Sequence, residues 1–322
     1  MLRALAALLR KRPDIGAILG ALILLMVFTL ADPQGWWSAN TIGNVVHYTA
    51  ILGIMAIGQS LVIMAREIDL SVGSVYGLVA VAFITFESSL GVPGAFVVAL
   101  AIGALIGYIN ALFVLRGRLV SMIVTLGALF FYRGLIYVWT GGTTKSFPQD
   151  ARTHWLTSFL GGNWLGFENA ILWFLLLIVV FTVVLTTTRF GNRLLAAGGD
   201  AASALSQGVD VVRTKTLAFV TCSTLAGLAG IITIADKPQT HVTLGEFMEL
   251  EAISAAVIGG CLLTGGRGSI IGAALGAFII TSVRYELIAL GAPSSWFITF
   301  VGILLIIAVI FNRWMLNFLQ RV

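Results

Sequence analysis

The chain of 322 residues is 59% hydrophobic and only 10% charged, with a formal net charge of +5. So few charges cannot solvate the surface of a soluble protein of this length, so the composition indicates a polytopic membrane protein. The basic residues then mark the cytoplasmic ends of membrane spans and do not indicate nucleic-acid binding. Both cysteines, Cys222 and Cys261, fall inside apolar runs, so neither a disulfide framework nor a metal site is predicted.

The amino end is basic over residues 1–14 and is followed by the uncharged run 15–31. No A-x-A cleavage site follows this run, whereas further apolar runs do. We interpret residues 1–14 as a cytoplasmic amphipathic helix on the inner leaflet, before a retained first span. A cleaved signal peptide is the alternative.

The chain contains ten apolar segments, separated by charged residues, prolines and glycine clusters. A helix that crosses about 30 Å of hydrocarbon needs about 20 residues. The segments are 15–31, 44–65, 71–86, 93–115, 119–140, 170–188, 216–235, 248–263, 268–283 and 295–311. With the amino end inside, 14 Lys and Arg residues lie on the cytoplasmic side and four outside, as the positive-inside rule predicts.

The predicted fold is therefore all-α, a polytopic integral membrane protein with one transmembrane domain over residues 15–311. Both ends of the chain, including residues 312–322, are expected in the cytoplasm, and residues 141–169 form an external loop. Three segments, 71–86, 248–263 and 268–283, are short for a full crossing. Short segments that begin at Gly, Ser or an acid favour broken or re-entrant helices beside a wet cavity.

A polar, glycine-rich loop with four cations separates two apolar runs at residues 189–215. Asp200 is placed to cap a short helix that begins at Ala201, and Gly208 is placed to end it. So short a helix on a cytoplasmic loop has no catalytic chemistry of its own. We therefore expect it to dock on a partner.

Polar side chains within or at the ends of the apolar segments are candidates for lining or gating a solute pathway, because each costs free energy there unless hydrated or paired. They are Gln59, Asp69, Ser71, Asn110, Thr125, Arg133, Glu249 and Glu251. The alternatives are helix–helix hydrogen bonds for the uncharged groups, capping for the three acids, and an interface anchor for Arg133. Adjacent Arg66 and Glu67 predict a local ion pair at the inner face.

Six sequence blocks occur in order along the chain. They are EIDLSVGSV (Glu67–Val75), VTLGALFFYRGL (Val124–Leu135), WTGG (Trp139–Gly142), TRFGNRLLAAGGDAASALSQGVDVVRTK (Thr188–Lys215), ELEAISAAVIGG (Glu249–Gly260) and GGRGSIIG (Gly265–Gly272). Together they resemble the membrane permease of bacterial ABC importers for simple sugars, the ribose-type family, from about residue 40 to residue 311.

The resemblance implies a permease of the bacterial inner membrane that passes a monosaccharide or sugar-like solute by alternating access. The implied partners are a second permease subunit (the same chain or a sister chain), a cytoplasmic ABC ATPase and a periplasmic solute-binding protein. The chain has no GxxxxGK phosphate loop, so ATP and Mg are expected on the ATPase and no cofactor on this chain. The family's ATPase-coupling segment matches Gly199, Asp200, Ala201, Ala202, Leu205, Gln207, Gly208 and Val209.

The chain departs from the family pattern where Arg66-Glu67 replace two glycines and where Asp200 replaces an asparagine. Arg66-Glu67, with the phrase around Arg133, favours the autoinducer-2 or rhamnose branch. An ion-gradient-driven secondary transporter is the main alternative, but it predicts acidic or histidine pairs near mid-membrane, whereas the acids here cluster at segment ends. A membrane scaffold would not need short segments or a docking loop, and no nucleophile–base spacing indicates an enzyme.

Overall fold

A computed structural model describes residues 14–164, 167–293 and 296–321 of the chain. The amphipathic helix predicted for residues 1–14 falls almost wholly outside this part. The helices are α2 Ile15–Ala31, α3 Ala39–Met64, α4 Val72–Ala111, the π-helical turn η1 Leu112–Arg116, α5 Ser121–Thr140, α6 Gln149–Arg152, α7 Trp155–Gly161, α8 Asn169–Thr187, α9 Arg189–Gly199, α10 Ala201–Ser206, α11 Val211–Asp236, α12 Met248–Ile258, α13 Ile270–Ala289 and α14 Trp296–Arg321.

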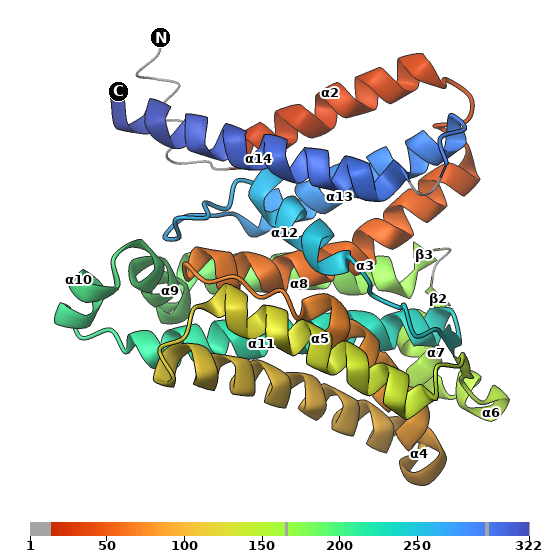
Figure 1. The fold of residues 1–322 in the computed structure, drawn as a ribbon. Coiled ribbons are helices and arrows are strands. Elements are labelled where there is room, and N and C mark those ends of the chain that lie inside the picture. Colours follow the sequence, from red (N-terminus) through yellow and green to blue (C-terminus); the bar gives the residue numbers. More distant parts are fainter. Residues whose placement is uncertain (1–13, 165–166, 294–295, 322) are drawn as a thin grey trace.

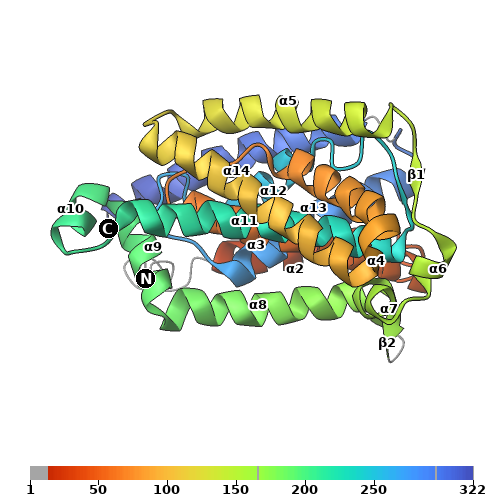
Figure 2. The ribbon, with the colours of Figure 1, turned by 90° about the horizontal axis from the view of Figure 1, so that it is seen from below.

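Four two-residue strands form two small antiparallel pairs: β1 Lys145–Ser146 with β4 Gln239–Thr240, and β2 Asn163–Trp164 with β3 Phe167–Glu168. The long helices lie side by side in one bundle (Figure 1). Helices α9 and α10 lie at one end, and α6, α7 and β2 lie at the opposite end in both views (Figures 1 and 2). The two irregular, polar regions are thus separated by the apolar length of the bundle.

The inside and outside of this bundle are both apolar. Helix α3 is buried without a break from Thr49 to Ala65 and packs against α8, α11, α12 and α13. In contrast, α2, α5, α8 and α14 expose large aliphatic side chains such as Leu30, Ile123 and Val138. Exposed apolar surface on this scale is rare on soluble monomers, so these faces meet lipid or another subunit.

Six of the described helices are long and apolar enough to cross a membrane: α3, α4 with η1, α5, α8, α11 and α13. Helix α2 and residues Trp296–Ile310 of α14 are apolar but shorter. The all-α fold is confirmed, whereas the number of ten crossings stays a prediction.

Helix α4 is a hairpin of two helices that reverse direction at Gly91 (Figure 1). Gly91 has φ 65° and ψ 171°, a conformation that glycine adopts at no steric cost. The arms, 72–90 and 92–111, pack against each other, and the side-chain amide of Asn110 donates to Ser71 Oγ at 2.9 Å across their far ends. The predicted segments 71–86 and 93–115 are these two arms.

Two of the three segments expected to be short are longer in the structure. The segment 71–86 continues as a helix to the Gly91 turn, and 268–283 continues as α13 to Ala289, which gives it 20 residues. The sequence cut at Arg284 was wrong because this arginine and Glu286 are carried on a continuing helix. Only α12, with 11 residues, stays short.

We predict that Asn110→Ala destabilises the protein by about 1–3 kcal/mol, because the Ser71 hydroxyl loses its donor and a buried side chain is removed. Thermal unfolding in detergent measures the change. Asn44→Ala is the matched control, since Asn44 is only partly buried and its side-chain bond to Asn40 stays within its own helix turn. Equal unfolding temperatures for the two variants would show that the Asn110–Ser71 hydrogen bond does not hold the two arms together.

Candidate functional site

The short helix α10 projects from one end of the bundle and has the caps predicted for it (Figure 1). Asp200 Oδ1 accepts from the backbone N–H groups of Ala202 (3.0 Å) and Ser203 (3.1 Å). Gly208 follows the helix with φ 80°, and no atom lies within 4 Å of the position that its Cβ would take. Leu205 is 65% exposed, so the loop leaves an apolar side chain uncovered at this end of the bundle.

The cap is ionised at neutral pH. The backbone N–H of Ser203 and then its hydroxyl lower the pKa of the Asp200 carboxyl below its usual range. A negative charge at this position also complements the positive end of the helix dipole. The exchange of the family's asparagine for Asp200 therefore retains the capping function.

Helix α9 joins α10 to the bundle through a close backbone contact that we call the glycine junction, formed by Gly198, Gly199, Gly265, Gly266 and the Met64 carbonyl. The backbone N–H of Gly266 donates to the Met64 carbonyl oxygen at 2.9 Å. A Cβ on Gly198 would overlap that same oxygen, and a Cβ on Gly266 would lie 2.7 Å from Gly199 Cα. The end of α9 thus rests directly on the end of α3 and on the turn between α12 and α13.

A second contact near this end corrects a prediction. Glu67 does not pair with Arg66, because Lys215 Nζ of α11 lies 2.6 Å from Glu67 Oε1 and both side chains are mostly buried. Arg66, before it, has φ 64°, a left-handed backbone conformation. The Lys215–Glu67 pair connects the start of α11 to the segment between α3 and α4.

Four predicted pathway residues gather in one buried polar network around residues 68–71. Asp69 Oδ1 accepts from the Ser71 hydroxyl (2.6 Å), and Ser71 in turn accepts from Asn110. Thr125 Oγ1 of α5 accepts from the Leu70 backbone N–H at 3.0 Å. All four side chains are at most 1% exposed. In the single chain they join helices, and their role in a solute pathway stays a prediction.

Gln59 is also fully buried, on α3 beside α11. Its Oε1 lies 3.5 Å from Cys222 Sγ, and its Nε2 has no hydrogen-bond partner within the described part of the chain. The structure therefore does not bring Gln59 into the Asp69 network.

The remaining three candidates lie around the start of α12. Arg133 Nη1 donates to the backbone carbonyls of Val242 (3.1 Å) and Leu244 (2.8 Å), so it holds the segment that enters α12. The Glu249 carboxylate lies against Gly73 of α4, and Glu251 Oε1 lies 3.6 Å from Arg284 Nη1. Arg133 therefore ties α5 to this segment, and its roles as a pathway residue or an interface anchor stay predictions.

No three His, Cys, Asp or Glu side chains within residues 14–164, 167–293 and 296–321 are grouped as a metal site requires. Sequence reasoning did not identify the glycine junction. The signal was present, because Gly198-Gly199 and Gly265-Gly266 are both paired glycines inside the quoted sequence blocks, but only the fold brings the pairs together.

A helical bundle with an apolar outer surface and a capped helix at one polar end defines a multi-spanning membrane protein. The chain belongs to the family described as the permease component of the branched-chain amino acid transport system, which matches residues 41–309. It is thus a membrane permease, as the ordered sequence blocks predicted.

Curated relatives show which members of the permease family this chain resembles. The chain is 35% identical to the autoinducer 2 import system permease protein LsrC of Enterobacter sp. (strain 638), over 92% of this chain and 86% of the relative. It is 32% identical to the ribose import permease protein RbsC of Escherichia coli K12, over 92% of each chain. No solved structure matches the chain significantly. The resemblance to ribose-type and autoinducer-2-type permeases is confirmed.

We predict that Gly198→Ala loosens the glycine junction, whereas Gly199→Ala does not. A Cβ on Gly198 would overlap the Met64 carbonyl, but the nearest atom to a Cβ on Gly199 is 3.8 Å away. Relieving such an overlap costs about 1–3 kcal/mol. We expect trypsin to cleave at Arg193 and Arg213 faster in Gly198→Ala than in the wild type or in Gly199→Ala. Equal cleavage of the two variants would contradict the junction.

Proposed function

We propose that this permease is the membrane subunit of an ATP-driven ABC importer for a monosaccharide or sugar-like solute. The observation that carries the proposal is identity of 32–35% along 92% of the chain to permeases named for ribose and autoinducer 2 import. The family description names branched-chain amino acids, but the two relatives cover the chain almost fully and agree on a small, sugar-like solute.

The energy source is a separate chain in this proposal. The sequence has no GxxxxGK loop that could hold ATP phosphates, so ATP and Mg bind a cytoplasmic ABC ATPase. That ATPase docks on residues Gly199–Val209, where α10 exposes Leu205. A periplasmic solute-binding protein delivers solute at the opposite end, against the external loop 141–169, and a second permease completes the pathway.

The coupling mechanism follows from the glycine junction. Movement of α10 is passed through α9 to Gly198, which is in backbone contact with the end of α3 and with the Gly265–Gly266 turn. These contacts leave no flexible side chain between the docking helix and the core. ATP binding favours one arrangement of the bundle over the other, which is the differential free energy that alternating access requires.

The proposed topology has ten crossings: α2, α3, the two arms of α4, α5, α8, α11, α12, α13 and α14. This number places the α9–α10 end and both chain ends in the cytoplasm, and α6 and α7 outside. It gives the 14-to-4 distribution of basic residues that the positive-inside rule predicts, in a bacterial inner membrane.

The test combines co-purification with solute uptake. We predict that Gly208→Asp, at the exposed end of α10, uncouples ATP hydrolysis from uptake, because it places a carboxylate on the docking surface. Aspartate tolerates the left-handed backbone better than most residues, so the variant still inserts. Replacing Gly199–Val209 by a Gly/Ser linker is expected to release the ATPase.

Gly291→Asp is the matched control for the backbone strain of the substitution. Gly291 has φ 88° and nothing within 4 Å of its Cβ position, and it lies outside both Gly199–Val209 and the external loop 141–169. Uptake by Gly291→Asp is expected to match the wild type. If no ATPase co-purifies with the wild type, or Gly208→Asp transports normally, the importer proposal fails. A gradient-driven transporter then becomes the hypothesis to test.

A further inference from the structure

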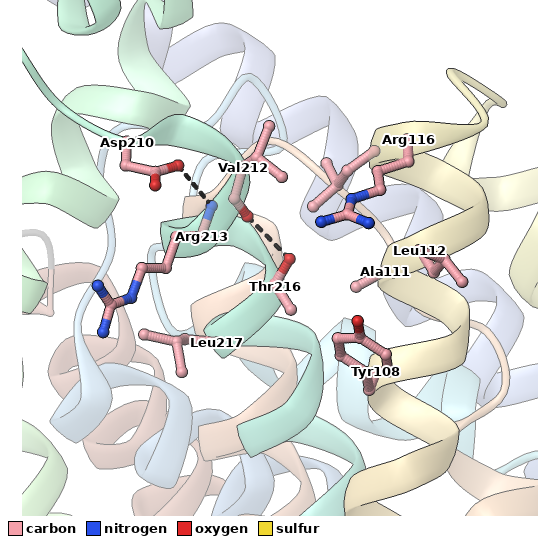
Figure 3. Close-up of a pocket in the computed structure, with 10 residues that line it drawn as sticks. Tyr108, Ala111, Leu112, Arg116, Asp210, Val212, Arg213, Thr216 and Leu217 are labelled. Atoms are coloured by element: carbon pink, nitrogen blue, oxygen red, sulfur yellow. Dashed lines mark hydrogen bonds between the residues drawn. The ribbon is translucent and has the colours of Figure 1, made fainter.

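A groove of about 330 Å³ opens between α4 with η1 and the first turns of α11, at the end of the bundle that carries α10 (Figure 3). This volume is at the lower end of the range for small-molecule sites, about 300–1,000 Å³. None of the residues that line the groove is among the predicted pathway residues, and Gly199–Val209 lies outside it. The groove is therefore separate from the site described above.

Two arginines flank the groove. Arg116 extends from η1 toward α11, and Arg213 projects from the other flank of the first turn of α11 (Figure 3). Both are exposed, and in the described part of the chain neither forms an ion pair. The nearby Asp210 is already engaged, since its Oδ1 accepts from the Arg213 backbone N–H at 2.8 Å. The guanidinium groups are left free to bind an anion.

The rest of the groove is mostly aliphatic. Leu112 and Leu217 line the groove and are 36% and 44% exposed, so their apolar surface is open to a ligand. Tyr108 lies deeper on the α4 side, below Arg116 (Figure 3). Eight residues separate Tyr108 from Arg116, which is about 12 Å along a helix. The groove thus extends from a charged rim at the end of the helices toward the part of the bundle that faces hydrocarbon.

A groove with a basic rim and an apolar floor suits a ligand that has an anionic group at one end and a hydrocarbon chain at the other. Guanidinium groups bind phosphate oxygens in a bidentate manner, and basic pockets between helices on the cytoplasmic side bind anionic lipid headgroups. A free phosphate would have no use for the leucines, and a zwitterionic lipid would bring its own cation against the arginines. Charge and depth together favour an anionic phospholipid.

We propose that this groove binds an anionic phospholipid of the inner leaflet, with its phosphodiester at the Arg116 guanidinium, the charge of Arg213 attracting it from the far flank of α11, and an acyl chain along the aliphatic residues of the groove. The proposal rests on the proposed orientation, in which the α10 end is cytoplasmic. The lipid bridges the hairpin arm 92–111 and the base of α11, beside the loop that carries α10.

Native mass spectrometry of the purified chain tests the proposal after incubation with equal amounts of phosphatidylglycerol and phosphatidylcholine. We expect the wild type to retain phosphatidylglycerol and the double variant Arg116→Gln/Arg213→Gln to retain about thirtyfold less, because two positive charges near the headgroup are lost. Arg116→Lys/Arg213→Lys keeps the charge and should retain more than the glutamine variant. An unchanged unfolding temperature in detergent shows that the exposed substitutions leave the fold intact.

Arg189→Gln/Arg193→Gln is the matched control, because it removes the same charge from exposed positions at the same end, outside the groove. Equal retention of both lipids by the wild type, or an equal loss in the control variant, overturns the proposal. So does normal lipid retention by Arg116→Gln/Arg213→Gln together with loss of the ATPase, which would make the groove a partner contact. Lipid retention without any co-purifying ATPase supports the lipid site while the importer proposal fails.

Discussion

The structure depends on one constraint of the bilayer: a backbone group at membrane depth needs a hydrogen-bond partner inside the protein. The segment between α3 and α4 breaks the helical pattern, although its Asp69 and Ser71 are fully buried. It does so because the hydroxyls of Ser121 and Thr125 accept from the Ile68 and Leu70 backbone N–H groups. The turn after α12 follows the same rule, since the Gly266 N–H donates to the end of α3. Both interruptions are therefore fixed elements of the bundle.

The same two interruptions border the region where α9 meets the core. One lies between α3 and α4 and includes Glu67, which pairs with Lys215 at the start of α11. The other is the Gly265–Gly266 turn, which contacts α9 directly. Both interruptions thus lie near the α9–α10 connection, so a force applied to α10 reaches α3, α11, α12 and α13 within a few residues.

Apolar length and charge identified most of the helices because hydrocarbon thickness fixes both. Segment 15–31 and the capped helix after Asp200 were located within a residue or two, and the Gly91 reversal separates two segments that were predicted apart. Prediction was wrong where a polar residue lies inside a continuing helix, as Arg284 does in α13. Contacts distant in sequence, such as Lys215 with Glu67 and Gly198 with Met64, were not predictable, because spacing along one chain carries no information on which helices become neighbours.

The residues on the two sides of the glycine junction also differ in how freely they can be substituted during evolution. At Gly198 and Gly266 the neighbouring backbones leave no room for a side chain, so almost every substitution must be matched by a shift of two helices. Helix α10 begins two residues after Gly199 and is largely exposed, so its side chains can be exchanged one at a time. A change of partner can therefore be accommodated on one side of the Gly199–Asp200 peptide bond without altering the bundle on the other side.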